Sequence, residues 1–226
     1  KVHKVNKVHK VWADFRLYRL STLKTFSGFT LVELIVTVGI FVFMTALVVA
    51  KYGSFNDGTL LTSMAYDIAL TMRDAQSYGL NVQGYNSTNS FNYPYGIDFN
   101  TSLNTQNQMI LFADSSVNGT GYGDGIYNSG DNAITTYTLA RGGLIKGLCV
   151  SNTALPPSNS NPCPTPNTTA VDVTFRRPNP NAIIWATVGG TSQKWAYAAI
   201  QVENASKNST RTIVVNQTGE IAVQNQ

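Results

Sequence analysis

Hydrophobic and polar residues follow three different patterns along this chain. From Phe29 to Ala50 the sequence is predominantly apolar and carries a single charge, Glu33. At about 1.5 Å per residue, a helix of this length spans roughly 33 Å, which is enough for the core of a bilayer. Apolar residues next recur every three or four positions, and beyond residue 90 they alternate with polar ones. These patterns predict a membrane helix, an amphipathic helix and a strand-rich body.

The amphipathic segment follows a predicted break at residues 51–58, where two glycines lie among Ser, Asn and Asp. We expect a helix over 60–78, capped by Asp57 or Thr59 and ended by Gly79. Its apolar residues share one face, which should pack on the body. They are Leu60, Leu61, Met64, Ala65, Ile68, Met72 and Ala75.

The rest of the chain is predicted to form antiparallel strands separated by polar loops rich in Asn, Ser, Thr and Pro. Alternation is clearest in 171–177, and a turn at 216–219 predicts a final hairpin. The fold class is therefore α+β, with one long helix against antiparallel sheet. The expected strands are 95–99, 109–113, 134–139, 145–150, 171–177, 182–188, 195–203, 212–216 and 220–223.

Charge and histidine are concentrated at the start of the chain. The 226 residues carry a net charge of +4, but residues 1–28 hold seven Lys and Arg against one Asp, which gives +6. Residues 29–226 hold nine Lys and Arg against eleven Asp and Glu and are therefore acidic. The basic net charge of the whole chain does not indicate a nucleic-acid-binding body. His3 and His9 are the two histidines, so the rest of the chain lacks a histidine-based catalytic triad or metal site. We expect a protein that is not an enzyme.

Three kinds of N-terminal segment fit a basic flank before an apolar run. A secretory signal has a shorter apolar core, and Val48-Val49-Ala50 is a poor cleavage site. An uncleaved anchor leaves Glu33 unexplained, since a carboxylate among apolar residues is costly and usually functional; the simpler alternative is that Glu33 snorkels or is protonated. The basic flank places the N-terminus in the cytoplasm and the body outside it.

The sequence Gly28-Phe29-Thr30-Leu31-Val32-Glu33 resembles the prepilin signal of type IV pilins and type II secretion pseudopilins. The resemblance implies cleavage between Gly28 and Phe29 by a prepilin peptidase, and N-methylation of Phe29. It also implies that the new Phe29 amine of one subunit pairs with Glu33 of a neighbour, which would remove the cost of an isolated buried charge.

This resemblance divides the chain into a cleaved leader (1–28), a membrane and assembly helix (29–52), a hinge with the second helix half (53–80) and a pilin-like body (81–226). The order of elements is similar to minor pseudopilin H and FimT-like proteins. The resemblance implies a structural subunit of a pilus or pseudopilus, held in the inner membrane before assembly. Its implied partners are other pilin subunits, the prepilin peptidase and an assembly platform.

Cys149 and Cys163 are the two cysteines of the chain. In an extracytoplasmic body, an even pair predicts a disulfide, which would close the Pro-rich segment 151–169. Two unpaired thiols are the alternative. Without histidine, the pair does not indicate a zinc site.

Residues 114–119 partly match the start of a calcium-binding loop, with oxygen ligands at alternate positions and a glycine. The candidate ligands are Asp114, Ser116, Asn118 and Asp124. The acid expected at the end of the loop is missing, since Gly125 is at that position. We therefore favour a hairpin loop that holds no ion, and expect no cofactor.

A DNA-uptake pilin is the alternative function. Such a protein needs several cations on one face, because phosphate binding depends on the release of counterions. The candidates are Arg176, Arg177, Lys194, Lys207 and Arg211, with Trp185 and Trp195 as stacking groups. They are sparse, and we expect them to be solvated strand residues instead. A membrane-anchored hydrolase is a third hypothesis, which the missing nucleophile motifs and histidines disfavour.

Overall fold

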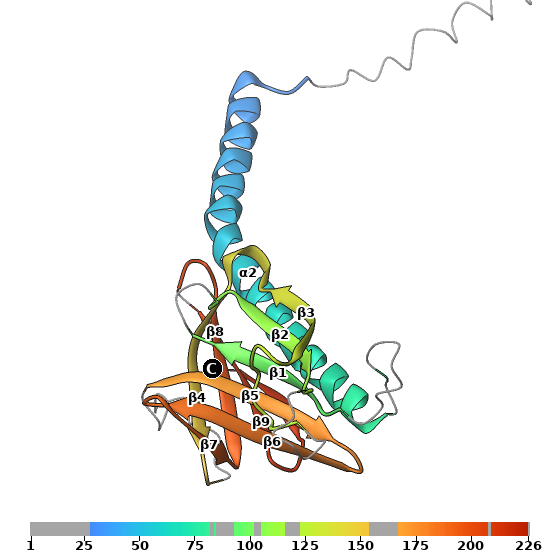
Figure 1. Ribbon diagram of the computed structural model, residues 1–226. Helices are drawn as coiled ribbons and strands as arrows, with labels where there is room; N and C mark the ends of the chain where they lie inside the picture. The colour runs from blue at the N-terminus through green and yellow to red at the C-terminus, as the bar shows by residue number, and fades with distance from the viewer. Residues whose placement is uncertain are drawn as a thin grey trace, which may run out of the picture. The chain divides into compact units, whose positions relative to one another are not determined.

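The computed structural model describes residues 28–81, 84, 93–101, 105–115, 123–153, 167–207 and 209–225. The chain divides into two compact units, Lys1–Lys51 and Tyr52–Gln226. The leader expected at 1–28 lies outside the described residues, apart from Gly28. Every element other than the start of the long helix belongs to the second unit, which is the α+β body described below (Figure 1).

Helix α2 runs from Leu31 to Leu80 without interruption, so the break expected at residues 51–58 is not present in the helix. Two glycines cost about 1 kcal/mol each relative to alanine. Extending an existing helix through them is cheaper than starting a second helix, because nucleation is the costly step. The hydroxyl of Thr62 donates to the carbonyl oxygen of Gly58, one helical turn earlier, at 2.9 Å.

The end of α2 lies tightly against the body. The backbone N–H of Arg177 donates to the carbonyl oxygen of Gly79 at 3.1 Å. A Cβ added at Gly79 would lie 2.8 Å from the carbonyl carbon of Phe175, which is too close for any other residue. Gly79 therefore does not terminate the helix but permits its last turn to approach a strand.

The larger sheet has six antiparallel strands in the order β3-β2-β1-β5-β6-β7. Its centre pairs β1 with β5, so that Ile97 lies opposite Val173 and Asp98 opposite Asp172. The strands are β1 (Tyr95–Asn100), β2 (Gln108–Ala113), β3 (Asn132–Thr138), β5 (Thr168–Arg176), β6 (Asn179–Val188) and β7 (Thr191–Trp195).

The smaller sheet has four antiparallel strands in the order β10-β9-β8-β4. The last two strands form the hairpin expected around residues 216–219. The strands are β4 (Leu144–Ser151), β8 (Tyr197–Glu203), β9 (Thr210–Asn216) and β10 (Ile221–Asn225), and the short 3₁₀ helix η1 (Ala140–Gly142) precedes β4.

One predicted strand is two strands in the structure. The segment 195–203 was expected to be continuous, but β7 ends at Trp195 and β8 begins at Tyr197. Strand β7 pairs with β6 through a tight turn at Gly189 and Gly190, whose φ angles of 58° and 85° favour glycine. Because β7 is polar and mostly exposed, no alternation of apolar residues marked its start.

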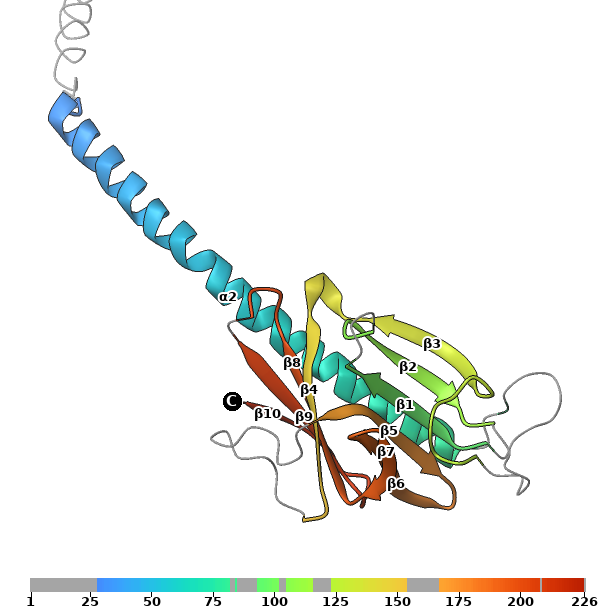
Figure 2. The same ribbon diagram turned by 60° about the vertical axis from the view of Figure 1, so that its left-hand side comes forward.

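A single large hydrophobic core joins α2 to strands of both sheets. Figures 1 and 2 both show α2 running alongside β1 and β2. The amphipathic face expected in the helix is confirmed, except that Leu60 is half-buried. Its core members are Leu61, Met64, Ala65, Ile68, Ala69, Met72 and Ala75. The body is therefore α+β with antiparallel sheets, as the sequence pattern predicted.

Candidate functional sites

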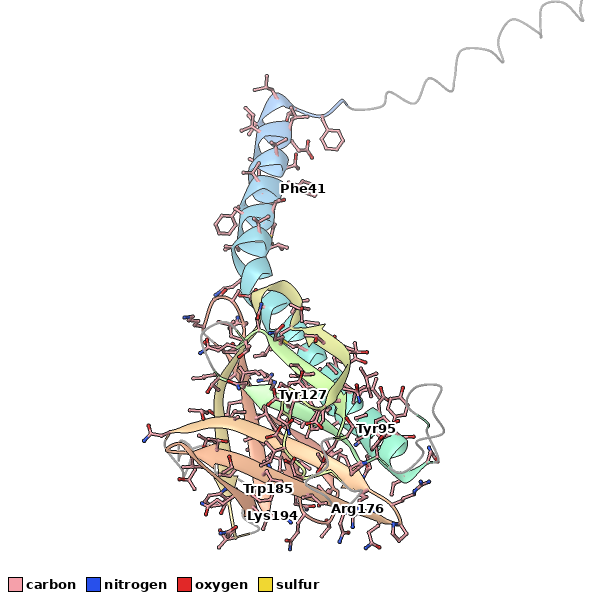
Figure 3. The ribbon with its side chains drawn as sticks, viewed as in Figure 1. Phe41, Tyr95, Tyr127, Arg176, Trp185 and Lys194 are labelled. Atoms are coloured by element: carbon pink, nitrogen blue, oxygen red, sulfur yellow. The ribbon has the colours of Figure 1, made fainter. Side chains whose placement is uncertain are left out.

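The first candidate site is the start of α2. Gly28 and Phe29 lie immediately before the helix, and both are exposed. Leu31–Lys51 is long and apolar enough to cross a membrane, and none of it is buried within the protein. Phe41, for example, projects away from the helix (Figure 3). An apolar surface of this size needs an apolar environment, which a bilayer or a set of similar helices would supply.

Thr30 caps the start of α2, a role that the sequence analysis missed. Its hydroxyl oxygen accepts a hydrogen bond from the backbone N–H of Glu33 at 3.2 Å, and its carbonyl oxygen accepts from Leu34 at 3.1 Å. The signal was available, because a threonine followed three residues later by glutamate is typical of a helix N-terminus. Glu33 itself lies in the first turn, where the helix dipole favours a negative charge.

Cys149 lies in β4, is buried and forms a disulfide. Cys163, the other cysteine of the sequence, lies outside the described residues. Cys149 packs with Tyr197, Ala199 and Val214 in a small cluster that is separate from the main core.

The second candidate site is the segment 123–131, which contains part of the predicted calcium loop. Asp114 is fully buried, and its Oδ2 atom accepts a hydrogen bond from the N–H of Gly125 at 2.7 Å. Asp124 instead accepts from the N–H of Ile126 at 2.9 Å. Ser116 and Asn118 lie outside the described residues. The two aspartates therefore bind backbone amides of this segment.

Asp131 holds the other end of the same segment. Its two carboxylate oxygens accept hydrogen bonds from the N–H groups of Ser115 and Asn128, both at 2.9 Å. Each oxygen holds a different backbone N–H group, one shortly after β2 and one within the segment 123–131. Asp131 therefore fixes the loop through its backbone N–H groups.

Two further aspartates lie beneath this segment, and the sequence analysis did not find them. Asp98 on β1 and Asp172 on β5 are directly opposite in the strand register, and they are 9% and 3% exposed. In the sequence, each lies between two apolar residues of a predicted strand, and such polar positions usually face solvent. The segment 123–131 covers that face instead, since the N–H of Tyr127 donates to Oδ1 of Asp172 at 3.0 Å.

Burial of these carboxyl groups disfavours their charged form. Burial and the neighbouring charge of Asp98 raise the pKa of Asp172 to about 8. Burial also raises the pKa of Asp114 to about 7, against the lowering effect of its hydrogen bond from Gly125, and the pKa of Asp98 to about 6. Near neutral pH, this cluster therefore holds protons that isolated aspartates would have released.

A metal ion would be the other way to compensate buried carboxylates. Within the described ranges, no group of three or more His, Cys, Asp or Glu residues is arranged to hold one. The Oδ1 atom of Asp114 is buried and makes no hydrogen bond. The arrangement can hold protons and fix the loop through its backbone amides.

The candidate DNA-binding cations are distributed over both sheets. Arg176 ends β5 and Lys194 lies on β7, whereas Arg211 lies on β9 and Lys207 in the turn before it. The Lys194 ammonium lies 5.2 Å from the ring centroid of Trp185 and so covers a face on which a base would stack (Figure 3). The structure therefore brings Lys194 together with Trp185 but does not gather the five cations on one sheet.

Comparisons of this chain with family models, with curated proteins and with solved structures found no match.

Proposed function

We propose that this protein is a minor pilin or pseudopilin, a structural subunit of a type IV pilus or of a type II secretion pseudopilus. The observation that carries the proposal is the position of Glu33. Glu33 is the one charged residue of an apolar run that begins directly after Gly28, and it follows that glycine by five positions. A peptidase that cuts after Gly28 would place a free amine at Phe29, close in sequence to that carboxylate.

The assembly mechanism follows from the physics of the apolar segment. The exposed side chains of Leu31–Lys51 would pack in the bilayer before assembly and against the helices of other subunits afterwards. In that packed environment, the Phe29 amine of one subunit would pair with Glu33 of its neighbour. Breaking such a pair leaves an uncompensated charge, so the pair selects one axial register between subunits.

The body is proposed to lie outside the cytoplasm, attached to the filament through the rest of α2. A disulfide at Cys149 supports this location, because disulfides persist in oxidising compartments. The proposed partners are other pilin-like subunits, a prepilin peptidase and a membrane assembly platform. The role is mechanical, with no catalysis by this chain.

Mass spectrometry of the membrane fraction tests the proposal directly. The mature chain should begin at a methylated Phe29. A Gly28→Leu variant, which alters only the residue before the proposed cut, should retain its leader. A mature chain that retains residues 1–28, or that lacks the whole apolar segment, would contradict the proposal.

A DNA-uptake pilin is the alternative, and the distribution of its candidate cations over two sheets does not favour it. Gel-shift measurements with the detergent-solubilised chain across a salt series distinguish the two functions. A DNA receptor should bind with a strong salt dependence, whereas a purely structural subunit should not bind.

A further inference from the structure

We propose that the groove between α2 and the edge strand β3 binds an extended segment of a partner protein. In this segment apolar and polar residues alternate, and at least one residue is Lys or Arg. The segment would add a strand to the open edge of the six-stranded sheet. The site lies entirely within the body, and the inference does not depend on filament assembly.

Strand β3 is an end strand of the sheet and pairs only with β2 among the described strands. Natural edge strands are usually protected by charged residues or proline. Asn132–Thr138 has neither over its seven residues. A bulge interrupts the pairing near Leu111 and Phe112, but 135–138 pair with β2 in regular register. This half of the edge is suited to accept another strand.

The register shows which backbone groups point outward. The N–H of Leu139 donates to the carbonyl oxygen of Asn107 at 2.7 Å, so residue 139 directs its backbone toward β2. Successive residues of an antiparallel strand direct these groups to opposite sides. Thr136 and Thr138 therefore direct their backbone N–H and C=O groups away from β2, toward the free edge.

A groove of about 330 Å³ runs between this edge and the helix. Its described lining is largely apolar, with Met64, Ile68 and Leu70 from α2 and Met109, Tyr137 and Leu139 from the sheet side. Leu70 is 59% exposed although it is a large apolar residue. A strand that paired with β3 would direct every second side chain to this side of the sheet, which is how strand addition combines affinity with specificity.

The charge of the groove identifies the chemistry of the occupant. Asp67 and Asp74 both line it, and its described lining contains no Lys or Arg. A basic residue in the bound segment would pair with these carboxylates. A second copy of this chain is disfavoured, because its β3 carries no cation and two acidic grooves would face each other. A bound helix would leave the backbone of Thr136 and Thr138 without partners.

Selection from a phage library of random twelve-residue peptides, on the full chain in detergent, tests the proposal. The enriched peptides should alternate apolar residues and contain Lys or Arg. Their affinity for the purified chain is measured by fluorescence anisotropy with the synthetic labelled peptide. Hydrogen exchange should slow at Thr136 and Thr138 when the peptide binds.

Two variants test the two parts of the site. Thr136→Pro removes an N–H that β2 does not use, so the sheet should remain folded while peptide binding is lost. Thr136→Val keeps the N–H and should bind normally. The double variant Asp67→Asn and Asp74→Asn should weaken binding by about five- to tenfold, as expected for two exposed ion pairs. Glu203→Gln, on the other sheet, should have no effect.

Several outcomes would overturn the proposal. These are the absence of any enriched peptide, peptides with helical spacing of apolar residues, and binding that Thr136→Pro leaves intact in a folded chain. Self-association that Thr136→Pro abolishes would instead identify a second copy as the occupant. Circular dichroism of each variant shows whether the chain is folded, so that loss of binding is not confused with unfolding.

Discussion

The backbone N–H of Tyr127 donates a 3.0 Å hydrogen bond to Oδ1 of Asp172, and this bond fixes the segment 123–131 over the outer face of the larger sheet. The ring of Tyr127 also packs on Phe112 of β2, with ring centroids 5.1 Å apart. Gly125 of the same segment lies against Trp185 of β6. The segment is therefore attached to several strands, and it binds the carboxyl group of the buried Asp172 directly.

The stability of the body should fall as pH rises from about 4 to about 8. Asp98, Asp114 and Asp172 have folded-state pKa values raised to about 6, 7 and 8. Between these pH values the folded state holds protons that the unfolded state has released. The stabilisation is therefore complete at a pH below the unfolded-state pKa of the aspartates, and it is lost as the pH rises through their folded-state pKa values. Each such proton contributes a slope of about 1.4 kcal/mol per pH unit.

Denaturant unfolding of the full chain in detergent at several pH values measures this dependence, with Trp fluorescence as the signal. An ordinary acid-labile protein would show the opposite trend, with stability rising between pH 4 and pH 6. Stability that is flat or rises from pH 5 to pH 8 would contradict the burial of these three carboxyl groups.

Asp172→Asn should stabilise the folded chain at pH 8 and reduce the pH dependence. The amide oxygen can still accept the hydrogen bond from Tyr127, and the substitution removes the charge that faces Asp98 across the strand pair. We expect a gain of about 1 kcal/mol or more at pH 8, with little change at pH 5. Asp74→Asn, at an exposed position of α2, is the matched control and should leave the pH dependence unchanged.

Most of the fold could be predicted from the sequence, because the periods of its apolar residues are clear. The core face of α2 and the centres of most strands follow directly from spacing. Strand β7 could not be found in this way, since it is polar and depends on its pairing with β6. The continuity of α2 through 51–58 was also missed, because glycine propensity alone overstates the cost of continuing an existing helix.

The sequence predicted the start of α2 but not the carboxyl cluster. Glu33 is conspicuous because it is the one charged residue between Phe29 and Ala50. Asp98 and Asp172 look like ordinary outward residues of alternating strands, and only the path of a loop distant in sequence makes them buried. Asp114 was noticed in the sequence as a candidate calcium ligand, and in the structure its Oδ2 atom accepts a hydrogen bond from the backbone N–H of Gly125. Local patterns cannot show which face a later loop will cover.

Gly79→Ala should destabilise the body by about 1–3 kcal/mol, because the added methyl group would overlap the backbone of Phe175. Gly58→Ala is the matched control within the same helix. Its Cβ would have no neighbour within 4 Å, so alanine should stabilise the chain by about 0.5–1 kcal/mol through helix propensity. Denaturant midpoints at pH 5 provide the measurement. Equal effects of the two substitutions would show that the helix end does not approach β5 as described.

The proposed pairing of Phe29 with Glu33 of a neighbouring subunit makes a prediction about assembly that is separate from processing. Glu33→Gln keeps the size and polarity of the side chain but removes its charge. The variant should still be cleaved after Gly28, whereas filament formation in cells should fall at least tenfold, because the Phe29 amine would be left uncompensated among apolar helices. Mass spectrometry of the chain and immunoblotting of sheared filaments measure the two steps independently.

Thr37→Val is the control for this prediction. Thr37 lies one turn further along the same apolar segment, and its hydroxyl donates to the carbonyl oxygen of Leu34 at 2.9 Å. Its side chain already has a partner within the helix, so replacing it should leave both cleavage and assembly intact. If Glu33→Gln also assembled normally, the charge on residue 33 would have no part in subunit pairing. The acid would then be explained by its favourable position in the first turn of α2.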